Sequence, residues 1–213
     1  VVDGDLARTQ AVRADADGRF GARIDTRRMS EATRPHRVVA YDAASGQASA
    51  ARSFRVDLPW QLLADVERPA GDDRGPDGRY RPPTHESYRP GQMDLRRVRV
   101  FAAGATLRIE LEMAALSTVW APANGFDHVA FTAFIGLPGR SDGATVMPQQ
   151  NASLPDGMRW QLRLRAHGWS NALFGPQGAS ATADGTPVTP AATITTDPAT
   201  RRVTFTVPAA ALG

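Results

Sequence analysis

Apolar and polar residues alternate one by one along much of the chain, and this period of two constrains the fold more than any other feature. The clearest runs lie at 20–24, 54–58, 107–113, 160–164 and 203–207. Such alternation is typical of β-strands with one buried and one solvated face. Clusters of Gly, Pro and Asp separate the runs, and 19 Gly and 16 Pro leave little room for long helices. The sequence therefore predicts an all-β protein of antiparallel strands.

The chain is expected to divide into two parts near residues 57–60. Residues 1–58 offer four candidate strands, at about 9–15, 19–26, 36–42 and 50–58, which are too few to close a sandwich. Residues 60–213 offer eight or more, enough for an antiparallel two-sheet β-sandwich with irregular stretches at 68–92 and 138–157. Because the first part lacks partner strands to cover Phe20, Ile24 and Phe54, we expect it to be unstable alone.

Composition and charge exclude several classes of function. The 213 residues carry 25 Arg, no Lys and 22 acidic side chains, a net charge of +3 without the dense basic stripe that a nucleic-acid backbone requires. There is no Cys, and hence no disulfide and no thiol nucleophile. No apolar run approaches the length of a membrane span. We therefore expect no nucleic-acid partner and no membrane span.

The catalytic motifs in the chain are incomplete. Residues 139–143 read G-R-S-D-G, but the following stretch lacks the helical pattern that a nucleophile elbow needs directly after its serine. The four His are scattered without metal-ligand spacing. Glu110 and Glu112 fall on the solvated face of a predicted strand. The sequence thus predicts a domain that is not itself an enzyme.

One irregular stretch carries a different signal. Residues 69–80 read P-A-G-D-D-R-G-P-D-G-R-Y, in which Gly and Pro restrict the backbone around the adjacent carboxylates of Asp72 and Asp73. Two neighbouring Asp repel one another unless a positive group lies between them. A calcium ion with oxygen ligands would supply that charge, and so would Arg74 or a neighbouring Arg. The residues alone leave both interpretations open.

The same stretch opens a series of motifs that resembles a known family. It is followed by Y-R-P-G-Q-M-D-L at 88–95, by V-W-A-P-A-N-G-F at 119–126, and by a Trp at 160 paired with Gly168-Trp169. These ordered pieces, spread over about 62–174, resemble the C-terminal domain of bacterial glucodextranases, although Asp77 interrupts the family's G-P-G element. Such domains are similar to DOMON and family-nine carbohydrate-binding-module sandwiches. Residues 1–58 resemble part of a bacterial immunoglobulin-like domain.

The resemblance implies a non-catalytic accessory module of a secreted or surface glycan-active enzyme. Its expected ligand is carbohydrate, and more specifically α-glucan, and its expected partner is a catalytic domain of the same longer polypeptide. The expected location is extracytoplasmic: secreted, periplasmic or at the cell surface. The alternative is a structural spacer or cell-surface attachment module with no sugar site. With the resemblance added, Asp72, Asp73 and Asp94 are the expected oxygen ligands of a structural calcium ion.

Aromatic side chains are few, which limits where a sugar could bind. A sugar ring stacks its apolar face on an aromatic plane, while polar neighbours orient its hydroxyl groups. Trp120 is the best candidate, with Trp169 or Tyr80 as a second wall and Asn124 as a hydrogen-bonding neighbour. Trp160 shares a strand face with two leucines and is expected in the core. For Trp120 and Trp169, core and surface positions are both open.

Overall fold

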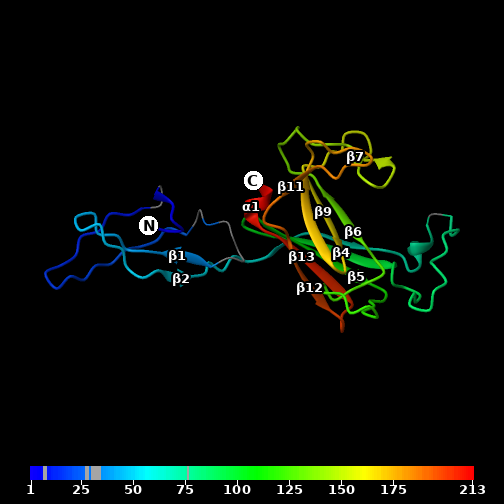
Figure 1. The fold of residues 1–213 in the computed structure, drawn as a ribbon, viewed down its shortest axis with the longest axis horizontal. Coiled ribbons are helices and arrows are strands. Elements are labelled where there is room, and N and C mark those ends of the chain that lie inside the picture. Colours follow the sequence, from blue (N-terminus) through cyan, green and yellow to red (C-terminus); the bar gives the residue numbers. More distant parts are fainter. Residues whose placement is uncertain (7–8, 27–28, 30–34, 76) are drawn as a thin grey trace.

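A computed structural model of the chain describes residues 1–6, 9–26, 29, 35–75 and 77–213, and within these it consists almost entirely of strands and loops (Figure 1). The strands are β1 (His36–Val38), β2 (Arg52–Phe54), β3 (Gln61–Glu67), β4 (Leu95–Ala103), β5 (Thr106–Met113), β6 (Phe131–Ile135), β7 (Val146–Met147), β8 (Ala152–Ser153), β9 (Leu162–His167), β10 (Ser170–Gly175), β11 (Thr186–Val188), β12 (Thr193–Asp197) and β13 (Arg202–Val207). A 3₁₀ turn over Asp72–Arg74 and a short helix α1 (Ala209–Leu212) accompany them. The strand pairings are antiparallel, so the predicted all-β class is confirmed.

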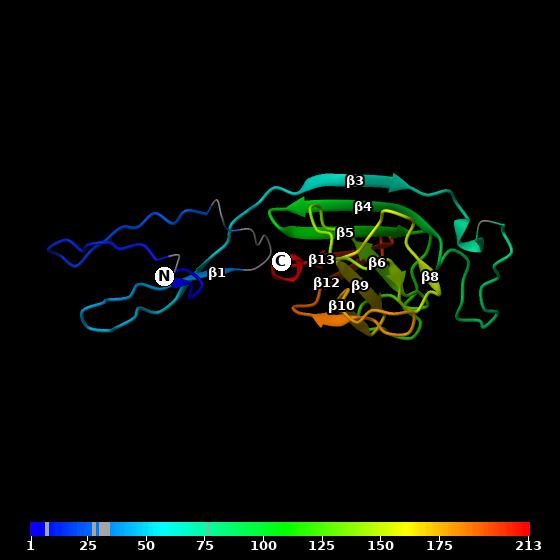
Figure 2. The ribbon, with the colours of Figure 1, turned by 90° about the horizontal axis from the view of Figure 1, so that it is seen from above.

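Two sheets pack face to face over residues 61–213 (Figure 2). One has five strands in the order β12-β13-β5-β4-β3, and the other has four in the order β11-β10-β9-β6. Their inner faces form one hydrophobic core, and burial of each large apolar side chain there stabilises the fold by roughly 1.5–3 kcal/mol. Its buried members include Ile109, Met113, Phe126, Leu162, Leu164, Leu173, Val203, Phe205 and Val207. The alternation predicted from the sequence therefore separates inner from outer positions of a sandwich.

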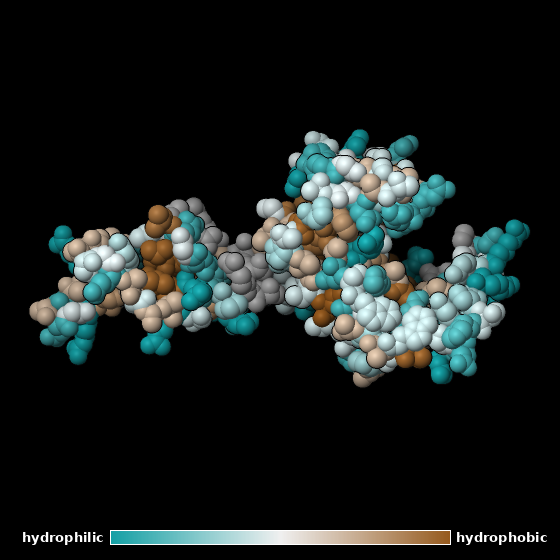
Figure 3. Space-filling model, viewed as in Figure 1, coloured by the Kyte–Doolittle hydropathy of each residue, from teal (hydrophilic) through white to brown (hydrophobic). Residues whose placement is uncertain are grey.

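The described residues of 1–58 form a thinner segment that extends to one side of the sandwich (Figures 1 and 2). Strands β1 and β2 pair there, but the strands predicted over 9–15 and 19–26 are wrong. The chain turns between them through a hydrogen bond from the Asp15 N–H to the Arg19 carbonyl, without continuing into a ladder. Phe20 and Ile24 remain exposed, and Figure 3 shows apolar surface on this segment.

Three connections carry the residues of the site considered next. Residues 114–130 cross from β5 to β6, residues 168–169 turn from β9 to β10, and residues 68–94 form a long loop between β3 and β4 (Figure 1). The crossing segment touches the turn closely: a Cβ at position 168 would lie 2.5 Å from the Phe126 carbonyl oxygen. Only glycine allows that approach, which explains why Gly168 precedes Trp169.

Candidate functional site

The exposed indole rings of Trp120 and Trp169 lie next to each other at the surface of the sandwich. Their side chains are 47% and 51% exposed, their ring centroids are 6.4 Å apart, and their planes differ by 28°. Trp120 comes from the crossing segment and Trp169 from the tip of the β9–β10 turn. We call this pair the Trp platform. A protein surface rarely exposes two large aromatic rings together unless they contact a ligand or partner.

Asn124 joins the two loops that carry the Trp platform. Its backbone N–H donates to the Gly168 carbonyl at 2.8 Å, and its side-chain Nδ2 donates to the His167 carbonyl at 2.7 Å. The backbone carbonyl of Asn124 accepts a hydrogen bond from the Thr196 hydroxyl at 2.8 Å. Nδ2 of Asn124 therefore holds the loops together, and the contact of this side chain with a sugar stays a prediction.

A buried pair of polar residues lies directly behind Trp120. The imidazole of His128 is fully buried and its centroid is 4.0 Å from that of the Trp120 ring, while Tyr88 packs edge-on against the imidazole at 4.6 Å. Nδ1 of His128 contacts Oδ1 of Asp127, whose Oδ2 accepts the backbone N–H of Trp120 at 2.8 Å. Burial would raise the pKa of Asp127, but hydrogen bonds from Trp120, the Ser117 hydroxyl and the imidazole outweigh it and hold this pKa below its usual value.

The geometry of the Trp platform decides how a flat ligand could bind. A ring held between two aromatic planes needs carbon contacts of about 3.5–4.0 Å on each face, and so about 7–8 Å between the planes. The centroids of Trp120 and Trp169 are only 6.4 Å apart, so no ring fits between them. Trp169 is thus not an opposite wall for a sugar on Trp120. Both indoles are instead exposed beside each other, with nearly parallel planes.

Comparison with known families agrees with this architecture. The model of the SLH-like C-terminal binding module of glucodextranase matches residues 63–213. The chain belongs to this family. The match spans both sheets of the sandwich and the Trp platform, and it confirms the resemblance that the sequence motifs indicated. A search of curated proteins found no match to the chain.

Tyr80 is the other residue that the sequence predicted to bind sugar, and that role stays a prediction. Tyr80 is exposed in the loop between β3 and β4, and no ring contact among the described residues joins it to Trp120 or Trp169. Sequence reasoning missed three residues that support the platform: Tyr88, Asp127 and His128. Tyr88 and Asp127 lie within or next to the family motifs at 88–95 and 119–126, but nothing in their spacing indicates that the two segments meet.

The acidic residues predicted to bind calcium are only partly placed. Asp73 is half-buried, and the side chain of Asp72 lies outside the described residues. Asp94 is buried; its Oδ2 accepts the Gly71 N–H at 3.0 Å and lies 3.4 Å from a guanidinium nitrogen of Arg96. Its Oδ1 is buried without a hydrogen-bond partner. Within the described part of the chain, no three His, Asp or Glu side chains gather as a metal site.

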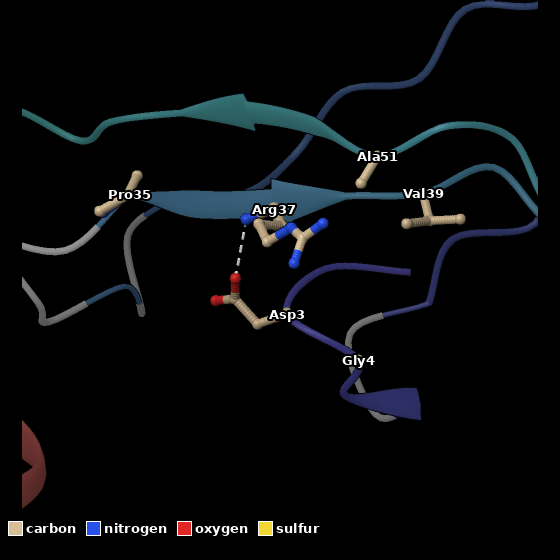
Figure 4. Close-up of a pocket in the computed structure, with 6 residues that line it drawn as sticks. All are labelled: Asp3, Gly4, Pro35, Arg37, Val39 and Ala51. Atoms are coloured by element: carbon tan, nitrogen blue, oxygen red, sulfur yellow. Dashed lines mark hydrogen bonds between the residues drawn. The ribbon is translucent and has the colours of Figure 1, made fainter.

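A hollow lies outside the family match, in the N-terminal segment (Figure 4). It is lined by Asp3, Gly4, Pro35, Arg37, Val39 and Ala51, and the Arg37 backbone N–H donates to Asp3 at 2.8 Å. This lining offers no aromatic plane for a sugar ring.

None of the helices in the described residues is long and apolar enough to cross a membrane.

Proposed function

We propose that the module binds carbohydrate, with α-glucan as its ligand, and that it does so on the Trp platform without catalysing a reaction. The observation that carries this proposal is the exposed, nearly parallel pair of indoles at Trp120 and Trp169. The apolar faces of successive sugar rings can cover such a surface while their hydroxyl groups remain in water. Membership of the glucodextranase binding-module family supports the same function.

The tilt between the two indoles favours a curved glucan. Sugar rings in an α-linked chain turn relative to their neighbours, whereas a flat β-linked ribbon offers nearly coplanar faces. Two aromatic planes inclined by 28° match successive rings of the curved chain better. Because solvated hydroxyl groups offset much of the stacking, we expect a dissociation constant on the order of 0.1–1 mM, or about 4–5.5 kcal/mol.

Such weak binding becomes effective when the module is tethered. We infer that it belongs to a secreted or surface glycan-active enzyme and that a catalytic domain of the same polypeptide is its partner. Tethering replaces a second bimolecular encounter with an intramolecular one, which raises the effective substrate concentration at the catalytic domain. The binding module would then position glucan without carrying catalytic residues of its own.

Titration with defined oligosaccharides tests the proposal. Maltoheptaose and isomaltoheptaose should give a saturable change in Trp fluorescence or heat, and cellohexaose a weaker one. Trp120→Ala should weaken binding more than tenfold, because covering one indole contributes roughly 1.5–3 kcal/mol. Tyr41→Ala, which removes an exposed ring from the N-terminal segment, is the matched control and should bind as the unaltered chain. Saturable binding that survives Trp120→Ala would overturn the platform as the site.

Attachment to a cell surface is the second candidate function, favoured by the SLH-like character of the family. In that case the Trp platform would bind a wall polysaccharide instead of an enzyme's substrate. Sedimentation with purified cell walls, in competition with soluble maltoheptaose, separates the two. Co-sedimentation that maltoheptaose does not reduce, together with no binding to soluble glucans, would favour attachment.

We further propose a structural calcium ion at the loop between β3 and β4. The support is the buried, unpartnered Oδ1 of Asp94, because a buried carboxylate oxygen without a partner carries a desolvation cost that a cation would offset. Asp73 and Asp72 would complete the oxygen set together with backbone carbonyls and water. The ion would tie the loop to the start of β4.

A further inference from the structure

The imidazole of His128 is an unusual choice for the position it occupies. Its backbone has φ of +65°, in the left-handed region where asparagine, aspartate and histidine are enriched among residues other than glycine. Its Nε2 is buried without a hydrogen-bond partner, which costs free energy that a hydrocarbon side chain would avoid. Simple filling of space therefore does not account for a histidine here. The remaining contacts are those with Trp120, Tyr88 and Asp127.

Those contacts restrain the Trp120 indole from two directions. The centroid separation of 4.0 Å and the 35° tilt place the imidazole against one face of the indole. The carboxylate of Asp127 holds both elements at once, with one oxygen on Nδ1 of His128 and the other on the backbone N–H of Trp120. Asp127 is itself fixed, because its backbone N–H donates to the Ser117 carbonyl at 2.9 Å. One buried carboxylate thus sets the position of the ring and of the backing behind it.

We propose that Asp127 and His128 are positioning residues of the carbohydrate site. They hold the Trp120 ring at its 28° inclination to Trp169 and occupy its inner face, so that sugar can reach only the remaining surface. Affinity for glucan then depends on two side chains that are buried and do not contact the sugar. This inference rests on the proposed function of the Trp platform and names what makes that site specific.

Three variants of the full chain separate the contribution of the His128 ring from that of the Asp127 carboxylate. His128→Asn removes the ring but suits the left-handed backbone, so it adds little strain. His128→Phe keeps a ring behind Trp120 and removes the bond to Asp127. Asp127→Asn keeps an acceptor for the Trp120 N–H. The matched control is His36→Asn, which removes an equally buried imidazole, paired with Asp3 at 2.7 Å, from the N-terminal segment.

Two measurements are made on each variant: binding of maltoheptaose by calorimetry, and the indole N–H signals of the four Trp by NMR in the absence of sugar. His128→Asn should weaken binding about three- to tenfold, the equivalent of losing one aromatic contact. It should shift the Trp120 indole signal and leave that of the core residue Trp160 unchanged. His128→Phe should restore most of the affinity, Asp127→Asn should fall between, and His36→Asn should match the unaltered chain.

The outcomes distinguish the positioning role from the function it supports. If the unaltered chain binds maltoheptaose and His128→Asn binds it equally well with an unshifted Trp120 signal, the positioning role is wrong and the carbohydrate site stands. If the unaltered chain binds no glucan, the proposed ligand is wrong, and the sugar-free indole signals decide alone. An unshifted Trp120 signal in His128→Asn would then overturn the positioning role of His128. A shift confined to Trp120 would support that role for a platform that binds another ligand.

Discussion

Two regions of the molecule carry the same alternating pattern and fold it differently. Phe20 in the N-terminal segment is 53% exposed, whereas Phe205 in β13 is completely buried. Strand β13 lies between β12 and β5 in a sheet that packs against a second sheet. The described residues of 19–26 join no sheet at all. An alternating pattern therefore indicates which side chains of a strand share a face. Those side chains become buried only where a second sheet packs against that face.

The same contrast explains why one region can hold a binding site and the other is less suited to one. The Trp platform stands on loops that are tied to each other and to a packed core, as by Asn124 and Gly168. The N-terminal hollow is lined by residues of a segment whose paired strands are three residues long. A site that depends on fixed ring orientation needs rigid supporting elements.

The largest difference between the two regions is expected in their stability as separate fragments. A fragment of residues 1–58 should show no cooperative melting transition and should aggregate, because a two-stranded ladder with exposed apolar side chains is marginal in water. A fragment of residues 60–213 should melt cooperatively near the midpoint of the full chain. Calorimetry and gel filtration of both fragments check this and test the predicted boundary near residues 57–60. A monomeric 1–58 fragment with a cooperative transition would break the comparison.

The next largest difference is expected in the free energy of unfolding when one phenylalanine of each region is replaced by alanine. Phe205→Ala should lower the free energy of unfolding of the sandwich by about 3–5 kcal/mol, because it removes a buried ring that packs on Phe131 at 5.7 Å. Phe20→Ala should change it by less than about 0.5 kcal/mol, since Phe20 is 53% exposed and belongs to no sheet. Urea unfolding of the full chain measures both. A comparable loss for Phe20→Ala would mean that the N-terminal segment buries this ring in solution.

The fold class and the core were predictable because both depend on local pattern. Trp160 was expected in the core from its position on a leucine-bearing strand face, and it is fully buried. Glu110 was expected on a solvated face and is instead buried, because Arg99 on the neighbouring strand pairs with it at 2.8 Å and other arginines cover it. The alternating pattern of a strand predicts on which face a residue lies. It does not predict whether long side chains of neighbouring strands cover that residue.

The support of the candidate site was not predictable from the same pattern. Trp120 was identified because it lies between the end of a predicted strand and Pro122, and the structure brings it to Trp169. Tyr88 and His128 join them only because three loops converge, and loop contacts leave no periodic signal.

The smallest expected difference concerns calcium and the loop between β3 and β4. If Asp94 contributes a ligand, 1 mM calcium acting on a site with a dissociation constant of about 0.1 mM should stabilise the sandwich by about 1.4 kcal/mol relative to chelator. That corresponds to roughly 3–6 °C in the melting midpoint of a domain of this size. Digestion of the N-terminal segment by protease should not change, because the ion would act on the sandwich alone.

Two variants make this last test specific to the loop. Asp94→Asn and Asp73→Ala should each reduce the calcium-dependent shift, whatever they do to the midpoint in chelator. Asp65→Asn, which breaks an ion pair with Arg97 on β4 outside the loop, should keep the full shift. Identical midpoints with calcium and with chelator would leave Arg96 as the positive partner of Asp94, 3.4 Å from its Oδ2. The loop would then be an arginine-satisfied structure, the other interpretation that its adjacent carboxylates allow, and Asp94→Asn would destabilise the sandwich equally in both buffers.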